Sequence, residues 1–183
     1  MKIPSIRIPS IRIPSMKIPL RYLPFGLSNK DSEKQVQMLK KSRTQYKKGK
    51  YFTRKQVPSF HSRPSKHVKN AQKIYRLNKI VPSKELAKAT GCSIDALNQI
   101  VKKGEGAYFS SGSRPNQTAQ SWGYARLASA LTAGKSAAVD FKILERGAIT
   151  VAKRSRWQKK RVKPTDLAME EQKDELLHKK LYV

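Results

Sequence analysis

The chain has 183 residues, which is enough for one domain of ordinary size with tails but not for two domains. Its 40 Lys and Arg residues against 12 Asp and Glu give a formal net charge of +28, which argues against a neutral partner and indicates an anionic one. A single cysteine excludes an intrachain disulfide and favours a reducing compartment, and no apolar run approaches the roughly 18 residues of a transmembrane helix.

The positive charge is unevenly distributed and predicts where the folded part lies. Residues 1–82 carry a net charge of +19, residues 83–150 only +4, and residues 151–183 +5. We therefore expect an α+β protein: a small, mainly helical domain with a short β-hairpin, flanked by extended basic arms. The expected parts are an extended arm (1–27), a basic and mostly irregular segment (28–70), a globular domain (71–152), and a basic linker with a C-terminal helix (153–183).

The N-terminal arm repeats with a period of five, and each repeat places an isoleucine directly before a proline. Proline at this density forbids a helix, and it holds the preceding residue in extended geometry. An extended ribbon cannot bury its own isoleucines, so we expect a docking arm that buries Ile3, Ile8, Ile13 and Ile18 against a neighbouring subunit. A disordered tail with accidental repetition is the alternative.

The segment that follows combines basic and aromatic residues. After a short helix expected over residues 28–41, the chain interleaves aromatic residues with five basic ones that we predict to bind a polyanion. The aromatic residues are Tyr46, Tyr51 and Phe52, and the basic ones are Lys47, Lys48, Lys50, Arg54 and Lys55. Lysine and arginine neutralise phosphates while aromatic rings stack on bases or pack on protein, and both uses leave the same composition.

Two helices with serine caps fit a helix-turn-helix after a first helix expected over residues 71–80. Ser83 and Ser93 are the predicted N-caps, and Gly91 supplies the turn between them. If this hairpin reads DNA, exposed Asn98, Gln99 and Lys102 are the candidates for base or phosphate contact. The alternative is a plain helical hairpin that supports the following loop, and Asp95, which would face phosphate, favours it.

The loop over residues 110–118 is polar, rich in turn residues and flanked by aromatic residues, which is typical of a fixed loop. Its candidate residues, together with two from the next helix, are Ser110, Ser113, Arg114, Asn116, Trp122 and Arg126. One interpretation is a structural loop whose side chains satisfy its own backbone, with Arg126 lying on the Trp122 ring. The other is an anion site formed by backbone N–H groups, serine hydroxyls and arginine.

The remaining elements are a helix, a hairpin and a terminal helix. A helix is expected over residues 119–132, with Tyr124, Leu127, Ala128 and Leu131 as its buried stripe. Residues 138–144 alternate in polarity and predict a strand that turns at Gly147 and returns over residues 148–151. Residues 164–180 run from acidic to basic and predict the C-terminal helix.

Catalytic chemistry finds little support in the sequence. The three histidines lie in the arms, no cluster has metal-ligand spacing, and Cys92 fits a buried structural thiol better than a nucleophile. We therefore expect no cofactor, no metal and no enzymatic activity. An activity built on Ser113, Arg114 and Asp140 is the alternative.

The loop and its flanks resemble an uncharacterised domain family of large DNA viruses and phages. The resemblance rests on Gly104 to Thr118 (GEGAYFSSGSRPNQT), then Ser121–Trp122, Ala125–Leu127 and Gly134 to Asp140. The stretch Ser42 to Val68 also resembles a basic module of algal-virus proteins. The resemblance implies a viral origin and transfers no catalytic residue.

Together these observations predict a structural virion component. We expect a minor capsid or internal particle protein, made in the host cytoplasm or nucleus and placed in the interior or on the inner shell face of the virion. Its expected partners are other capsid proteins in a large assembly, with viral DNA or another polyanion as a further candidate. A free nucleic-acid-binding protein that uses residues 83–103 is the alternative.

Overall fold

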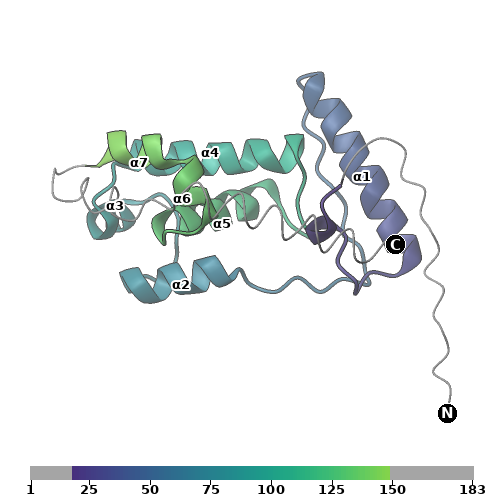
Figure 1. The fold of residues 1–183 in the computed structure, drawn as a ribbon, viewed down its shortest axis with the longest axis horizontal. Coiled ribbons are helices and arrows are strands. Elements are labelled where there is room, and N and C mark those ends of the chain that lie inside the picture. Colours follow the sequence, from purple (N-terminus) through teal and green to yellow (C-terminus); the bar gives the residue numbers. More distant parts are fainter. Residues whose placement is uncertain (1–17, 149–183) are drawn as a thin grey trace, which may run out of the picture.

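The protein is described here by a computed structural model that covers residues 18–148, and this part of the chain is helical (Figure 1). Its elements are η1 (Leu20–Tyr22), α1 (Asn29–Lys47), α2 (Lys66–Tyr75), α3 (Lys84–Thr90), α4 (Ile94–Ser110), α5 (Ala119–Leu131), α6 (Lys135–Val139) and α7 (Phe141–Gly147). Within residues 18–148 there is no strand, and pairing of the β type is limited to one antiparallel bridge between Cys92 and Ala148. The expected α+β fold with its β-hairpin is therefore wrong.

The centre of the fold is the contact between α4 and α5, where two glycines bring the helix backbones together (Figure 1). A Cβ atom on Gly104 would lie 2.6 Å from the Cα of Gly123, and one on Gly123 would lie 2.9 Å from the carbonyl oxygen of Val101. Both distances are too short for a real side chain. The close approach lets Ile100 and Leu127 become fully buried in the main apolar core.

The predicted hairpin of α3 and α4 is confirmed with its serine caps, but α4 runs on to Ser110 instead of ending near Gly104 as expected. The hydroxyl oxygens of Ser83 and Ser93 accept hydrogen bonds from the backbone N–H groups of Leu86 and Ala96, both at 3.2 Å. Gly91 lies between the helices with φ +72°, a left-handed conformation that a glycine adopts without strain. Cys92 follows it with a fully buried side chain that is in no disulfide, as predicted.

The expected strand over residues 138–144 is instead the end of α6 and most of α7. The buried residues there are Ala137, Asp140 and Leu144, and their spacing of three and four is that of a helix. The alternating pattern suggested a strand because Asp140 was counted as polar and exposed, whereas it is fully buried. Val139, predicted to face the core, is 61% exposed. The returning strand falls almost entirely outside the described residues.

Helix α2 begins and ends earlier than the helix predicted over residues 71–80. It stops at Tyr75 because Arg76 takes a left-handed conformation (φ +54°), and the backbone N–H of Leu77 then bonds to the carbonyl of Gln72. The apolar residues expected on one face of a helix over 71–80 are therefore divided between α2 and the segment after it. Ile74, on α2, is 48% exposed. Ile80 is buried, but it lies in the segment between α2 and α3 and not on a helix. The helix predicted over 119–132 is confirmed as α5, with Thr118 as its cap.

Helix α1 continues to Lys47, beyond the end expected at residue 41, and carries a second apolar cluster. That cluster consists of Ile18, Tyr22, Val36 and Leu39, with Leu23 and Trp122 packed against it. Tyr22 and Trp122 meet edge to face at 6.1 Å between ring centroids, which joins this cluster to α5. The segment 28–70 was expected to be mostly irregular, and it contains this long helix. The predicted helix over 164–180 lies outside the described residues.

Candidate polyanion interface

The polar loop after α4 is held by a buried arginine from a distant part of the sequence. The guanidinium of Arg54 donates to the hydroxyl of Ser113 (2.8 Å), the carbonyl of Tyr108 (3.0 Å) and the hydroxyl of Ser42 (3.0 Å). Its central carbon lies 3.6 Å from the centroid of the Tyr108 ring. Arg54 was predicted to bind a polyanion, but it is 9% exposed and its donors are used within the protein.

Other residues of the basic segment bind the same loop. Arg43 donates twice to the carbonyl of Ser111 (2.6 and 3.2 Å), and the amide of Gln35 donates to the carbonyl of Ser113 (3.2 Å). Asn116, in a left-handed conformation, exchanges two hydrogen bonds with the backbone of Val57. The loop's polar groups are therefore largely satisfied inside the chain, which agrees with the structural interpretation and leaves few groups for an anion.

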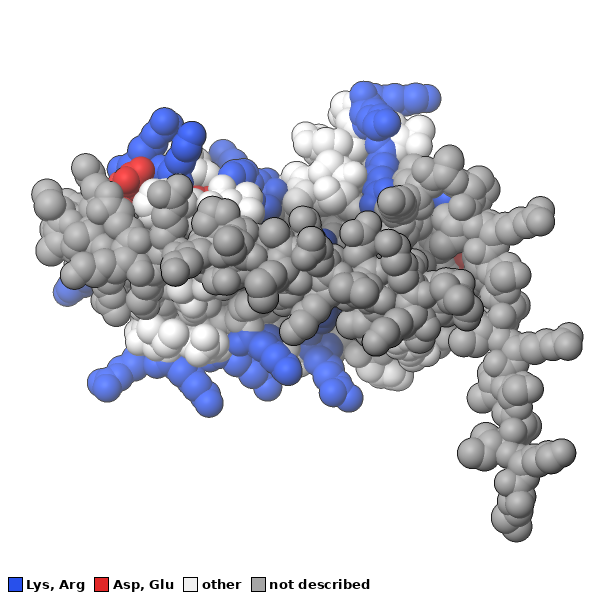
Figure 2. All heavy atoms as spheres, viewed as in Figure 1, with Lys and Arg blue, Asp and Glu red and all other residues white. Residues whose placement is uncertain are grey.

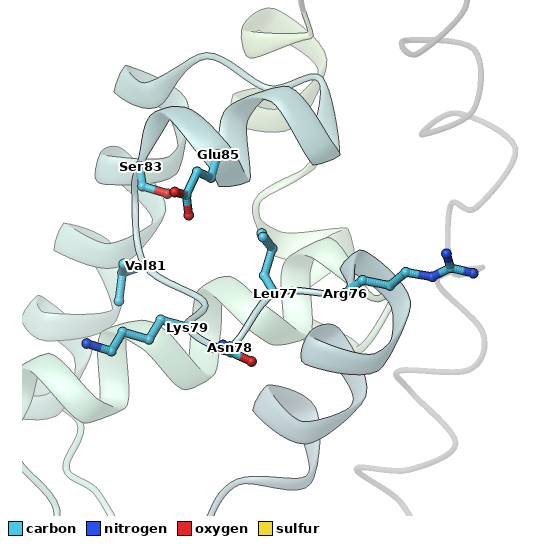
Figure 3. Close-up of a pocket in the computed structure, with 7 residues that line it drawn as sticks. All are labelled: Arg76, Leu77, Asn78, Lys79, Val81, Ser83 and Glu85. Carbon is cyan, nitrogen blue, oxygen red and sulfur yellow. The ribbon is translucent and has the colours of Figure 1, made fainter.

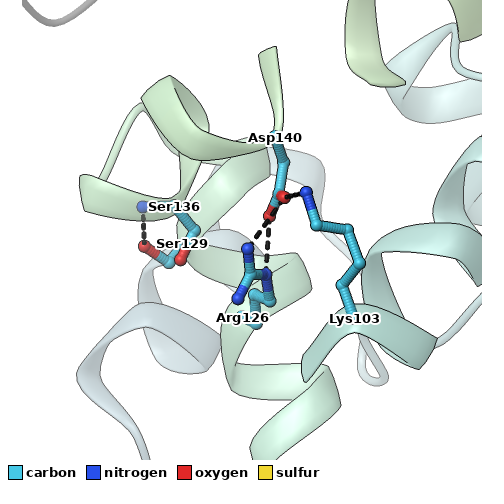
Figure 4. A network of polar contacts seen from close by, with 5 residues as sticks. All are labelled: Lys103, Arg126, Ser129, Ser136 and Asp140. Carbon is cyan, nitrogen blue, oxygen red and sulfur yellow. Dashed lines mark hydrogen bonds and ion pairs between the residues drawn. The ribbon is translucent and has the colours of Figure 1, made fainter. Parts of the chain in front are cut away.

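The predicted unit of Arg114, Asn116, Trp122 and Arg126 does not form. Arg114 is exposed, and Trp122 packs on Tyr22 instead of lying under Arg126. Arg126 makes a bidentate ion pair with fully buried Asp140, at 2.7 and 2.9 Å (Figure 4).

Lys103 completes this ion cluster by contacting Oδ1 of the same carboxylate, an oxygen that also accepts from Arg126. Its ammonium nitrogen lies 2.7 Å from Asp140, so two cations from α4 and α5 meet one anion at the start of α7 (Figure 4). The cluster ties together α4, α5 and the start of α7, because two cationic side chains share one buried carboxylate. Ser113 and Asp140 thus belong to separate networks, the first with Arg54 and the second with Arg126.

Exposed basic residues lie at the projecting end of α1 and on other faces of the described part of the chain, including α2 (Figure 2). At the end of α1 they are accompanied by a cluster of aromatic rings. Lys47, Lys48, Lys50 and Lys55 are all exposed, as the predicted polyanion-binding role requires. Among the described residues none of these four lysines takes part in an ion pair. We call the three lysines Lys47, Lys48 and Lys50, together with the rings of Tyr46, Tyr51 and Phe109, the α1 tip.

The rings of the α1 tip contact one another across two parts of the chain. Tyr46 and Phe109 are nearly parallel (6°) with centroids 6.5 Å apart. Tyr51 meets Phe109 edge to face at 5.0 Å and Tyr46 at 6.1 Å. Tyr51 nevertheless remains 72% exposed as a residue, and Tyr46 36%. The sequence pointed to Tyr46 and Tyr51, but it gave no sign that Phe109 joins them.

The candidate DNA-reading residues are on the surface of α4. Asn98, Gln99 and Lys102 are all exposed, so the hairpin presents them as predicted. The amide nitrogen of Gln99 donates to the carboxylate of Asp95 (2.7 Å), which is exposed on the same helix. A carboxylate on this face opposes contact with phosphate, and reading of DNA by these residues stays a prediction.

The isoleucines of the N-terminal arm are only partly within the described residues. Ile18 is 8% exposed and packs in the second apolar cluster of its own chain, so this residue is covered without a neighbouring subunit. Ile3, Ile8 and Ile13 lie outside the described residues, and their docking stays a prediction.

A shallow hollow of about 310 Å³ lies between the end of α2 and the start of α3 (Figure 3). Its lining residues are Arg76, Leu77, Asn78, Lys79, Val81, Ser83 and Glu85. The side chains of Arg76 and Lys79 point away from the hollow rather than toward a common point (Figure 3). Such a mixed lining does not form a charged or catalytic centre.

Residues 18–148 contain neither a group of metal ligands nor a helix able to cross a membrane. No group of three or more His, Cys, Asp or Glu side chains in that range could hold a metal ion. None of its helices combines the length and the apolarity that a membrane crossing requires.

Comparison with known proteins identifies a family but no characterised relative. Searches of the curated proteins and of the solved structures each found no match. One family profile matches residues 19–146, which include nearly all of the described helical fold and both networks around Arg54 and Asp140. This match covers well over half of the chain, and the protein therefore belongs to the family described as a family of unknown function, DUF5824.

Proposed function

We propose that the protein is a non-catalytic structural component of a large DNA virus particle and binds the packaged genome or another polyanion through its exposed basic surface. The proposal of polyanion binding rests on one observation. The polar groups of this region fall into two sets, one hydrogen-bonded inside the chain and one exposed to solvent. The loop that resembles a binding site is hydrogen-bonded to Arg43, Arg54 and Val57 inside the chain. The lysines of the α1 tip face outward without ion-pair partners in the described region.

The particle part of the proposal rests on the resemblance to viral proteins and on the Pro-patterned arm. An arm that repeats Ile-Pro suits attachment to a neighbouring subunit, while exposed lysines suit contact with phosphates on the inner side of a shell. We expect purified particles to contain the chain at a fixed ratio to the shell proteins. Abundance in infected cells with absence from the particles would instead favour the free nucleic-acid-binding alternative.

The binding part is tested with two duplex DNAs of unrelated sequence. Counterion release makes the logarithm of the binding constant fall linearly with the logarithm of the salt concentration, by about 0.9 per neutralised phosphate in duplex DNA. We expect a steep slope that is the same for both duplexes. A shallow slope, or affinities that differ strongly between the two sequences, would contradict binding through unspecific phosphate contact.

The hairpin of α3 and α4 supports the second candidate function. Asn98 and Gln99 are exposed on α4, where a recognition helix would present them, and amide side chains pair well with adenine. This candidate predicts that Asn98→Ala and Gln99→Ala remove discrimination between DNA sequences. The proposal above predicts that the same two changes leave affinity nearly unchanged.

A further inference from the structure

We infer that the α1 tip binds single-stranded nucleic acid, with Tyr51 stacking on a base while the surrounding lysines hold the phosphates. This inference rests on the proposed polyanion binding and names the class of polyanion that this surface takes. Tyr51 is the central residue because it is 72% exposed although its side chain is large and aromatic. A single exposed ring would need no explanation, but exposed Tyr46 and Tyr51 adjoin Phe109, and a contiguous apolar patch rimmed by polar residues marks an interaction site.

The rings form a platform that is already assembled. Tyr51 meets the Phe109 ring at 5.0 Å and the Tyr46 ring at 6.1 Å, so two neighbours restrain its position while much of its surface stays open. Phe109 is in turn fixed from behind by Tyr108, whose ring lies 4.9 Å away and is fully buried. A restrained ring loses little conformational freedom when a base stacks on it.

Charge selects the occupant of this surface. Lys47, Lys48 and Lys50 surround the turn at the end of α1 and are exposed. Lysine at a helix C-terminus also complements the helix dipole, which accounts for Lys47 but not for Lys50 beyond the turn. Planar rings beside a row of cations match a chain of alternating bases and phosphates.

The exposed rings favour a single strand over a duplex. Bases in a duplex are stacked on each other and present only their edges, so a protruding tyrosine finds no open base face there. A single strand offers both faces, and stacking on an aromatic side chain stabilises the complex whatever the base sequence. The α1 tip is therefore expected to prefer single strands without preferring a sequence.

The test compares Tyr51→Leu and Tyr51→Phe in the full chain with two probes. One probe is oligo(dT) of about 12 nucleotides, and the other is an abasic oligonucleotide of the same length, which keeps the phosphates but lacks bases. Tyr51→Leu keeps apolar packing but removes the aromatic face, whereas Tyr51→Phe keeps that face. We expect Tyr51→Leu to weaken oligo(dT) binding about tenfold and Tyr51→Phe to weaken it little.

The abasic probe separates stacking from electrostatics. Neither Tyr51 variant should bind the abasic probe differently from the unmodified chain. The triple variant Lys47→Gln, Lys48→Gln, Lys50→Gln should bind both probes more weakly. The matched control is the triple variant Lys66→Gln, Lys69→Gln, Lys73→Gln on α2. It removes the same charge from exposed positions of a helix that has no exposed Phe, Tyr or Trp. It should preserve the preference for oligo(dT) over the abasic probe.

Each other outcome has a defined meaning. If Tyr51→Leu lowered the affinity for both probes equally, or for neither, base stacking would be overturned while polyanion binding remained intact. Equal weakening of polyglutamate binding by Tyr51→Leu would overturn it in favour of an acidic protein partner. Failure of the unmodified chain to bind any of these anions would contradict the proposed function itself.

Discussion

Arg54 shows how one residue fixes the conformation of a loop that looks like a binding site. Burial lowers the pKa of Arg54, and no carboxylate among the described residues compensates it. An arginine nevertheless keeps its charge in proteins, so the guanidinium must be stabilised by hydrogen bonds and by the Tyr108 ring. Its contacts join residues 42, 108 and 113, which lie far apart in the sequence.

Arg54→Ala is therefore expected to destabilise the fold strongly. The change leaves the Tyr108 carbonyl and the Ser113 hydroxyl without their donors in a buried place, at a cost of roughly 3 kcal/mol in the free energy of unfolding. Urea denaturation measures this loss. Lys55→Ala is the control, because Lys55 is the exposed neighbour and should change stability by less than about 0.5 kcal/mol. Equal stability of the two variants would refute the structural role of Arg54.

Asp31 and Ser59 give a prediction about pH. The hydroxyl and backbone N–H of Ser59 both donate to the Asp31 carboxylate, and they lower its pKa below the ordinary value of 3.8. A lowered pKa contributes stability that is complete above the unfolded pKa and is lost as pH falls through the folded pKa. The loss of melting temperature caused by Ser59→Ala should thus be largest near neutral pH and shrink toward about pH 2.

A part of the Ser59→Ala effect is independent of pH, because the Ser59 hydroxyl also accepts from the backbone N–H of Ser28. Ser65→Ala serves as the control, since the Ser65 side chain makes no cap hydrogen bond at the start of α2. Its small effect on melting temperature should be the same at all pH values. A Ser59→Ala penalty that did not change between neutral and acidic pH would contradict the assignment of the Asp31 shift.

At the residue scale the sequence predicted exposure better than it predicted partners. It placed Lys47 correctly on the surface, because a lysine in a highly basic stretch is rarely buried. It grouped Arg54 with that residue because nothing local distinguishes a buried arginine. The acceptors of Arg54 come from α1 and from the end of α4, and only the folded chain brings them together. The pair of Arg126 and Asp140 escaped prediction for the same reason.

At the scale of elements, the contact of α4 with α5 depends on glycine at two positions. A Cβ at Gly104 would lie 2.6 Å from the backbone of Gly123, so Gly104→Ala forces the helices apart. We expect a loss of roughly 3 kcal/mol in the free energy of unfolding. Gly106→Ala on the same helix is the matched control, because its Cβ would find nothing closer than the Tyr46 hydroxyl at 3.6 Å. It should stabilise the helix by about 0.5–1 kcal/mol.

Thermal unfolding of the two alanine variants followed by circular dichroism measures this difference. Opposite signs are expected for Gly104→Ala and Gly106→Ala. Destabilisation of equal size in both would mean that α4 tolerates no alanine for reasons other than the contact with Gly123.

The elements that the sequence predicted well are those with local signals. Ser83, Gly91 and Ser93 mark helix ends through bonds to their own neighbours, so the hairpin could be predicted from them. The error at residues 138–144 arose because burial of Asp140 depends on Arg126 from another helix. Once Asp140 counts as an inward-facing residue, the helical spacing of the buried positions becomes visible. Alternation over so few residues could not separate the two cases.

At the scale of the whole molecule, two parts of the chain that were predicted to be separate are interlocked. Residues 42–57 bind the loop that follows α4 through Ser42, Arg43, Arg54 and Val57. Basic side chains that remain exposed lie at the α1 tip, along α2 and on other helices of the described part of the chain (Figure 2). Net charge predicts an anionic partner, and this stays a prediction. Composition alone cannot say which lysines remain exposed after folding.

The most direct test of the proposed polyanion binding is the salt dependence of duplex DNA binding by the full chain and its Lys47→Gln, Lys48→Gln, Lys50→Gln variant. If these lysines contact phosphates, the slope of log binding constant against log salt should become shallower by about two to three. The account would be contradicted if that slope stayed unchanged while Asn98→Ala and Gln99→Ala abolished binding.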